Sequence, residues 1–121
     1  MRFLTPILMA LFVAGCSVDP EVAAERRAVL NEGLIPNPAD RDGVFLAHPL
    51  GSGGSISAVY FVWEPSKISE TKARQIVSGI CARSGRSGPI SIDKDLETGT
   101  RTLPDGKTID VREVIFGCEF D

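Results

Sequence analysis

The sequence has few of the residues that most often carry out chemistry near neutral pH. Its 121 residues include one histidine, one tryptophan and one tyrosine. His48 stands alone, so we do not expect a zinc site built on several histidines, and a general base is the one catalytic role left for it. Positive charge is not in excess either, because 13 basic residues face 16 acidic ones and the net charge is −3. We therefore expect no metal or other cofactor and no nucleic-acid partner.

The chain also lacks an apolar run long enough to span a membrane. Residues 3–14 are apolar apart from Thr5 and Pro6, whereas a transmembrane helix needs about 20 apolar residues. Arg2 places positive charge before this run, and the small residues Ala14 and Gly15 end it. A buried helix at an ordinary N-terminus is the alternative. The position, the basic flank and the small residues together favour a secretory signal peptide over residues 1–15.

The end of the apolar run is more specific than a general cleavage site. Val13-Ala14-Gly15-Cys16 resembles the lipobox of bacterial lipoprotein precursors. The resemblance implies that the thiol of Cys16 receives a diacylglyceryl group and that the chain is cut just before it. Because members of this family carry several acyl chains, the resemblance also implies a lasting attachment to the lipid bilayer.

The residue after the lipidated cysteine gives the expected destination. In Gram-negative members of the lipoprotein family, aspartate at this place tends to retain the protein in the inner membrane. Here the residue is Ser17, and Asp19 lies one place beyond the usual window. The resemblance therefore implies a protein anchored at the periplasmic face of the outer membrane of a Gram-negative cell.

Cysteine is scarce, and the count suggests a role for each one. With Cys16 assigned to lipid, Cys81 and Cys118 remain. An exported protein meets an oxidising compartment, where such a pair normally forms a disulfide. Closing the loop of 38 residues from Cys81 to Cys118 stabilises the fold by roughly 4 kcal/mol in the chain-entropy model. A reactive thiol near His48 is the less favoured alternative.

Residues 16–42 are expected to form a lipidated tether with a short helix and a linker. Asp19-Pro20-Glu21 is typical of a helix start, and Gly33 is the expected end of that helix. The helix has a thin apolar stripe, which suggests a partly exposed segment next to the membrane. Residues 34–43 are rich in proline, asparagine and aspartate, as linkers are.

Residues 43–121 are expected to form one small α+β domain, with one helix packed on a mainly antiparallel sheet. A helix is predicted over about 69–83, with Ser69 as N-cap. Residues 56–63 are dense in β-branched and aromatic residues and predict a central strand. Shorter strands are expected near residues 44–48 and 89–93, and residues 100–111 predict a hairpin with its turn at Pro104-Asp105-Gly106.

Two periodic patterns place the cysteines. Helical spacing puts Cys81 on one apolar stripe with Ala73, Ile76, Val77 and Ile80. Strand alternation puts Cys118 on one face with Val114, Phe116 and Phe120. Because a small domain has one core in which to bury both faces, the two sulfurs are expected to meet and to fasten the helix to the sheet.

Two short motifs resemble catalytic elements without their context. Ser69 and Lys72 have the S-x-x-K spacing of penicillin-binding proteins, but the companion elements of that family are absent from the sequence. An N-cap serine and a surface lysine are therefore favoured. Gly106-Lys107-Thr108 resembles the end of a phosphate-binding loop, but the glycine five places earlier is replaced by Arg101 and a strand pattern follows.

Three other features have weak functional interpretations. Asp93, Asp95 and Glu97 alternate as in a calcium loop, but the glycine and glutamate that such a loop requires are missing, so a solvated acidic loop is favoured over an irregular calcium site. The Gly51–Ser55 segment is expected to be a flexible loop rather than an anion cradle. Core positions are favoured for the aromatic residues Tyr60, Phe61 and Trp63 over exposed partner contacts.

These observations predict an anchored envelope protein without catalytic activity. The expected role is a binding, assembly or envelope-maintenance module whose partners are the bilayer, through acylated Cys16, and an unidentified envelope protein or the cell wall. A small enzyme acting on envelope components is the first alternative, and clustered acid-base residues would distinguish it. An inhibitor or immunity protein is the second alternative, for which a rigid disulfide-linked domain is suited.

Overall fold

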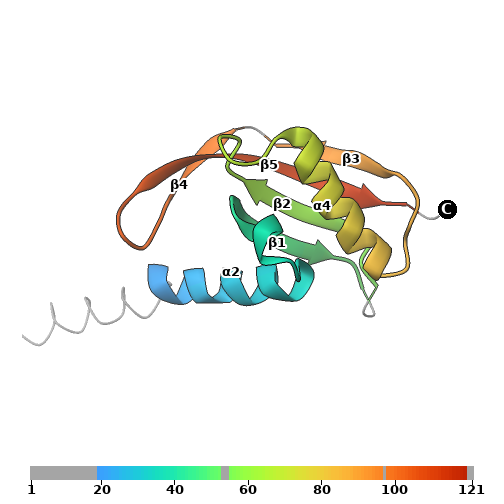
Figure 1. The fold of residues 1–121 in the computed structure, drawn as a ribbon, viewed down its shortest axis with the longest axis horizontal. Helices are drawn as coiled ribbons and strands as arrows, with labels where there is room; N and C mark the ends of the chain where they lie inside the picture. The colour runs from blue at the N-terminus through green and yellow to red at the C-terminus, as the bar shows by residue number, and fades with distance from the viewer. Residues whose placement is uncertain (1–18, 53–54, 97, 120–121) are drawn as a thin grey trace, which may run out of the picture.

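The computed structural model describes residues 19–52, 55–96 and 98–119. The expected signal peptide and Cys16 lie outside these residues, as do Glu97 and Phe120. In chain order the described elements are α2 (Pro20–Leu34), α3 (Pro38–Arg41), β1 (Val44–Leu50), β2 (Ala58–Trp63), α4 (Glu70–Arg83), β3 (Ile90–Asp95), β4 (Gly99–Thr102) and β5 (Thr108–Cys118). Figure 1 shows the described helices and strands and labels each of them except the short helix α3.

The strands form an antiparallel sheet in the order β1-β2-β5-β3. β2 pairs with β5 only as far as Trp63 opposite Arg112, whereas β4 pairs with β5 from Val111 back to Thr108. β4 and the first residues of β5 therefore extend past the end of β2 as an arm, residues 99–111, which Figure 1 shows projecting away from the rest of the sheet. The expected hairpin is confirmed, with its turn at Pro104–Gly106.

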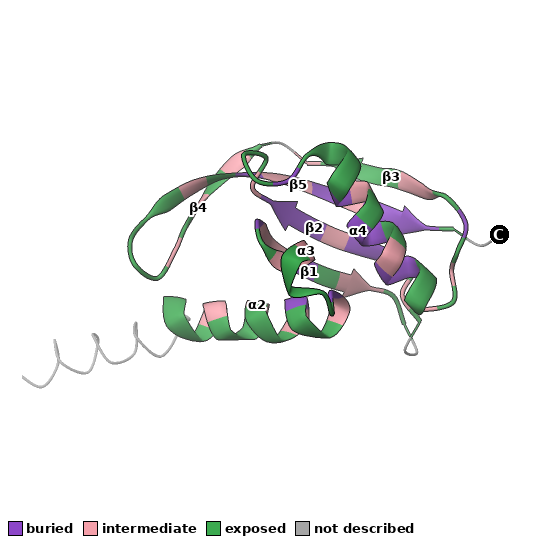
Figure 2. Cartoon of the chain, in the orientation of Figure 1, coloured by how far each residue is buried: buried purple, intermediate pink, exposed green. Residues whose placement is uncertain are grey.

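α4 covers one face of the sheet, as the periodicity predicts. Its five buried residues are the expected stripe Ala73, Ile76, Val77, Ile80 and Cys81. They pack in one core with Phe61, Trp63 and Phe116, whose ring centroids lie 5.6–6.5 Å apart. Figure 2 shows buried residues on α4 and on the strands β2 and β5 that it crosses.

The disulfide is formed where the two patterns predicted it. The Cys81 and Cys118 sulfurs are bonded, with a Cα–Cα distance of 5.5 Å. Both cysteines are buried in the same core. The bridge therefore joins the last turn of α4 to the end of β5, and the predicted packing of helix on sheet is confirmed.

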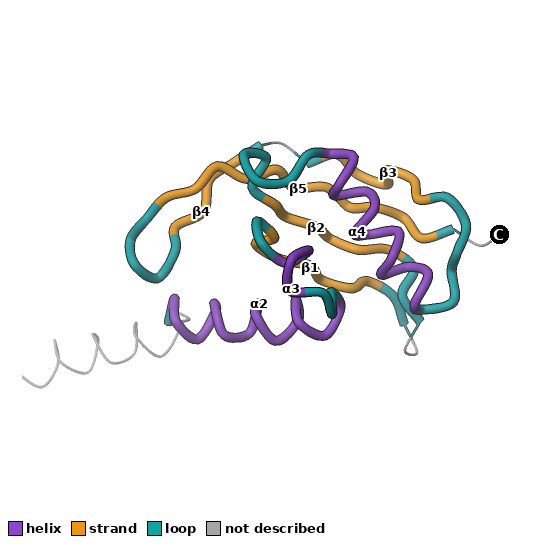
Figure 3. Tube along the Cα trace, viewed as in Figure 1, coloured by secondary structure: helices purple, strands orange, loops and turns teal. Residues whose placement is uncertain are grey.

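The segment expected to be a linker has structure of its own. Figure 3 shows the short helix α3 within it, between α2 and β1. Ile35, the residue directly after α2, is 2% exposed and packs in the core. Gly33 lies inside the last turn of α2, which ends at Leu34, and β1 continues past His48 to Leu50.

Candidate functional site

The motif around Ser69 and Lys72 is structural. The Ser69 hydroxyl oxygen accepts a hydrogen bond from the Lys72 backbone nitrogen at 3.1 Å, which is an N-cap contact. The Lys72 ammonium donates to a carboxylate oxygen of Asp40 at 2.6 Å. The Lys72 ammonium therefore joins α4 to α3, and the Ser69 hydroxyl caps the first turn of α4.

The other sequence-derived candidates lie apart from one another. His48 is exposed on β1, with its Nδ1 atom 2.9 Å from the Pro49 carbonyl oxygen. Lys107 belongs to the tip of the arm, where its backbone nitrogen donates to the Asp105 carboxylate. Among residues 19–52, 55–96 and 98–119, no three histidine, cysteine, aspartate or glutamate side chains lie together as a metal site would require.

The expected acidic loop is replaced by strand β3 over its first part. Asp93 accepts a hydrogen bond from the Ser91 hydroxyl at 3.2 Å. Asp95 lies at the end of β3 and pairs with Arg112 of β5 at 3.3 Å. The two carboxylates thus have partners of their own along the edge of the sheet.

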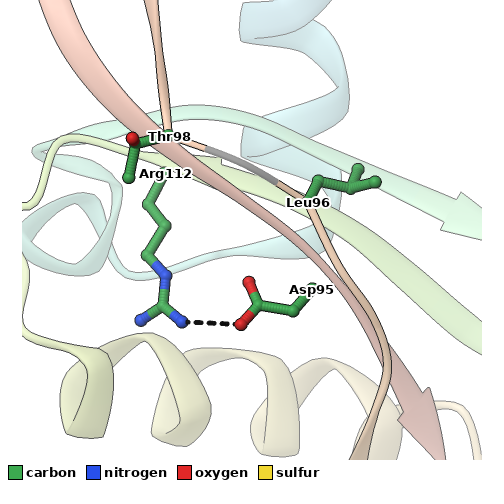
Figure 4. Close-up of a pocket in the computed structure, with 4 residues that line it drawn as sticks. All are labelled: Asp95, Leu96, Thr98 and Arg112. Atoms are coloured by element: carbon green, nitrogen blue, oxygen red, sulfur yellow. Dashed lines mark hydrogen bonds and ion pairs between the residues drawn. The ribbon is translucent and has the colours of Figure 1, made fainter.

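A hollow of about 360 Å³ lies beside this ion pair, lined by Asp95, Leu96, Thr98 and Arg112. Figure 4 shows the Arg112 side chain directed toward Asp95, with Leu96 turned away from it. Arg112 also donates to the Glu70 carboxylate at the start of α4. This contact and the attraction between the two charges lower the pKa of Glu70, and contact with Glu70 raises the pKa of Arg112. Arg112 of β5 therefore pairs with one carboxylate of α4 and one of β3, and these two contacts join the three elements.

A second polar group lies on the face of the sheet that α4 does not cover. We call it the Phe45 cluster, and it comprises Arg27 of α2, Phe45 of β1, Tyr60 of β2, Arg101 of β4 and Glu113 of β5. The Tyr60 hydroxyl and the Arg101 guanidinium both donate to the same oxygen of Glu113. The cluster thereby connects the arm to the centre of the sheet.

Two guanidinium groups lie near the same aromatic ring in this cluster. The Cζ atoms of Arg27 and Arg101 are 4.0 Å and 5.9 Å from the centroid of the Phe45 ring. Burial lowers the pKa of Arg27, and the charge of Arg101 lowers it further. Glu113 is the carboxylate that balances Arg101, so the cluster keeps an excess of positive charge beside an aromatic surface, a combination that can bind an anionic or aromatic group.

Sequence reasoning did not find the Phe45 cluster. Strand alternation placed Glu113 opposite the core face, but nothing in the spacing linked Arg27 to Arg101, which is far along the chain. Tyr60 is half-buried, whereas Phe61 and Trp63 are in the core as expected. The signal that was available was Tyr60 alone, a phenol on a buried strand that requires a polar partner.

No protein-family model, curated protein or solved structure matches this chain. Within the residues that the structure describes, no helix has both the length and the apolar character needed to cross a membrane. What the chain does is therefore inferred from its own residues.

Proposed function

We propose that this chain is a lipid-anchored bacterial envelope lipoprotein, held by acylated Cys16 at the periplasmic face of the outer membrane of a Gram-negative cell. Its folded part acts there as a non-catalytic binding, assembly or envelope-maintenance module. The lipobox-like sequence before Cys16 supports the anchor, and Ser17 supports the destination.

The observation that carries this proposal is the disulfide between Cys81 and Cys118. A bridge of this kind persists in oxidising compartments such as the periplasm. It also uses both cysteines of the folded part, so that Cys16 is the one remaining thiol in the sequence. Export and lipidation of Cys16 account for all three cysteines together.

The Phe45 cluster supports a binding role. Arginine and aromatic side chains supply much of the energy of protein contacts. Arg27, Arg101 and Phe45 come from three different elements, and the Glu113 carboxylate holds one of the two arginines. An acidic or aromatic group of an envelope partner would fit such a surface.

The anchor is tested by metabolic labelling with a palmitate analogue in a Gram-negative host. Wild-type protein should incorporate the label, and Cys16→Ser should lose it and accumulate as uncut precursor. Ser17→Ala is the matched control, since it changes the neighbouring residue, keeps all three cysteines and should remain labelled. A Cys16→Ser protein that is acylated at the wild-type level would overturn the proposal.

The destination is tested by separating the two membranes on a density gradient. Wild-type protein should sediment with outer membranes, and Ser17→Asp should move it to the inner membrane. Wild-type protein in the inner membrane would contradict the assigned location.

Crosslinking in intact envelopes, with wild type compared against Arg27→Ala and Arg101→Ala, tests whether the Phe45 cluster contacts a partner.

A further inference from the structure

The outward face of α2 carries apolar side chains that the rest of the fold leaves exposed. Val29 is 70% exposed and Val22 is 40% exposed. In the described part of the chain, the one other large apolar residue exposed to this degree is Ile92 of β3. The two valines are seven residues apart, so two turns of helix bring them to the same side, with Arg26 between them. With Glu25 and Leu30, they line one shallow hollow.

This face lies opposite the side by which α2 is attached. Asn31 and Arg27 contact β1, through its backbone and through the Phe45 ring respectively. Helical geometry places Val29 roughly half a turn away from both. Figure 1 shows α2 along one margin of the molecule, outside β1, with the sheet and α4 on its other side. A flat surface can therefore approach Val22 and Val29 without meeting the sheet first.

The sequence places this face close to the proposed anchor. Asp19 caps α2 by accepting a hydrogen bond from the Glu21 backbone nitrogen at 2.9 Å, and Pro20 is the first helical residue. Cys16 and Asp19 are three residues apart, which span at most roughly 10 Å when fully extended. If acyl chains on Cys16 enter the bilayer, the first turn of α2 must lie at the level of the lipid headgroups.

We propose that Val22, Arg26 and Val29 rest on the phospholipid surface, so that α2 lies parallel to the membrane and holds the sheet at a fixed orientation above it. This inference rests on the proposed lipid anchor. Two valines bury too little apolar area to bind a free protein to lipid, but the anchor makes the contact intramolecular and so raises its effective concentration. Arg26 suits the phosphate level, where its stem lies along lipid and its guanidinium meets headgroup oxygens.

The flanking acidic residues limit the depth of this contact. Glu21, Glu25 and Glu32 are exposed on α2. Carboxylates stay in water because leaving it costs far more than the apolar contact returns. The helix is therefore expected to lie at the interface without crossing it, and to need no anionic lipid for its contact.

The test uses full-length, lipidated protein in vesicles of phosphatidylethanolamine with a minority of phosphatidylglycerol. A spin label is placed by Val29→Cys, and its collision rates with oxygen and with a water-soluble nickel chelate are measured. Ala28→Cys is the matched control, exposed on the same helix but about 100° further round it. Thr71→Cys on α4 is a second exposed control.

The expected result is an oxygen-to-nickel accessibility ratio severalfold higher at position 29 than at positions 28 and 71. Introducing Val29→Asp should lower the ratio of a label at position 22 to the value of the controls, while Ala28→Asp leaves it unchanged. Because Val29 is mostly exposed, unchanged urea unfolding of Val29→Asp shows that the fold is intact.

Two results would overturn the inference. A label at position 29 that is as open to nickel as position 71, in protein whose lipidation is verified by mass spectrometry, removes the membrane contact but leaves the anchor. A label protected from both reagents means that a second copy or another protein covers this face. Failure of the anchor itself is seen separately, as protein without acyl mass.

Discussion

The side-chain oxygen of Asn31 accepts a hydrogen bond from the backbone nitrogen of Ala47 at 2.9 Å, and this contact joins α2 to the outer edge of the sheet. The Asn31 amide nitrogen lies 3.4 Å and 3.5 Å from the carbonyl oxygens of Phe45 and Val44. One side chain thus supplies the donor and the acceptor that a further strand would present to β1. This edge of the sheet is covered as a result, which discourages pairing with another chain.

Replacing Asn31 should therefore destabilise the fold more than its place on a largely exposed helix suggests. Asn31→Ala leaves the buried Ala47 backbone N–H without a partner, which costs about 1–3 kcal/mol. Glu25→Ala, at an exposed position of the same helix, should change the free energy of unfolding by less than about 0.5 kcal/mol. Urea unfolding followed by the fluorescence of Trp63 measures both. Equal effects of the two substitutions would mean that Asn31 does not support β1.

Tyr60 should titrate above the ordinary tyrosine range. Burial raises the pKa of Tyr60, and its hydrogen bond to Glu113 and the charge of Glu113 raise it further, while Arg101 lowers it. Glu113→Gln should therefore lower the pKa of Tyr60, and Arg101→Gln should raise it. Tyr60 is the one tyrosine of the chain, so ultraviolet absorbance against pH reports on it directly. Shifts in the same direction for both variants would contradict the geometry of the Phe45 cluster.

The same pKa shift predicts how stability depends on alkaline pH. The pKa of Tyr60 in the folded protein lies above its unfolded value of about 10. The contribution of Tyr60 to the free energy of unfolding is therefore fully present below about pH 10. It is lost as the pH rises through the folded pKa, because the unfolded chain ionises first. Unfolding midpoints should fall above about pH 10, and should fall less steeply in Tyr60→Phe.

Glu70 should titrate below the ordinary glutamate range. Its hydrogen bond and attraction to Arg112 lower the pKa of Glu70, with a smaller contribution from Arg74. A depressed carboxylate pKa contributes stability above the unfolded pKa, and that contribution is lost as the pH falls through the folded value. Carboxyl NMR titration should show the pKa of Glu70 rising in Arg112→Gln and rising less in Arg74→Gln. Because Glu70 is exposed, added salt should reduce the shift in wild type. If neither arginine variant moved the titration, the contacts around Arg112 would be wrong.

Gly43 and Gly85 have nearly the same backbone conformation. Alanine substitutions at the two positions therefore distinguish the cost of backbone strain from the cost of steric crowding. Gly43 and Gly85 have φ angles of +92° and +89°. A Cβ atom at Gly43 would lie 2.8 Å from the Lys67 Cβ atom, whereas one at Gly85 would meet nothing within 4 Å. Gly85→Ala should cost about 1–2 kcal/mol for the backbone alone, and Gly43→Ala about 1–3 kcal/mol more. The difference between their urea unfolding free energies checks this, and costs that are alike would show that Lys67 moves aside freely.

The core of the fold could be predicted because its signals are local and periodic. The stripe on α4 and the alternation along β5 each identify a buried face, and Cys81 and Cys118 lie on those faces. Ser69 marks the start of α4 because a serine before a helical pattern satisfies backbone donors of the first turn. These patterns required no knowledge of distant contacts.

The attachment of α2 and the Phe45 cluster could not be predicted for the opposite reason. Asn31 is a single polar residue on a helix with a thin apolar stripe, so no period marks the side that packs. Arg27, Tyr60, Arg101 and Glu113 come together because the arm and α2 approach the same face of the sheet, which is a property of the tertiary fold. Ile35 is one apolar residue in a segment whose composition otherwise resembles a linker.

The Cys81–Cys118 bond closes a covalent ring that contains β3, the whole arm and β5. A cut at the exposed tip of the arm, for example by trypsin after Lys107, would open this ring without releasing a fragment. The two pieces would travel as one band on a non-reducing gel and separate only after reduction. The disulfide therefore lets the projecting arm be cut by a protease while the two resulting pieces stay covalently joined.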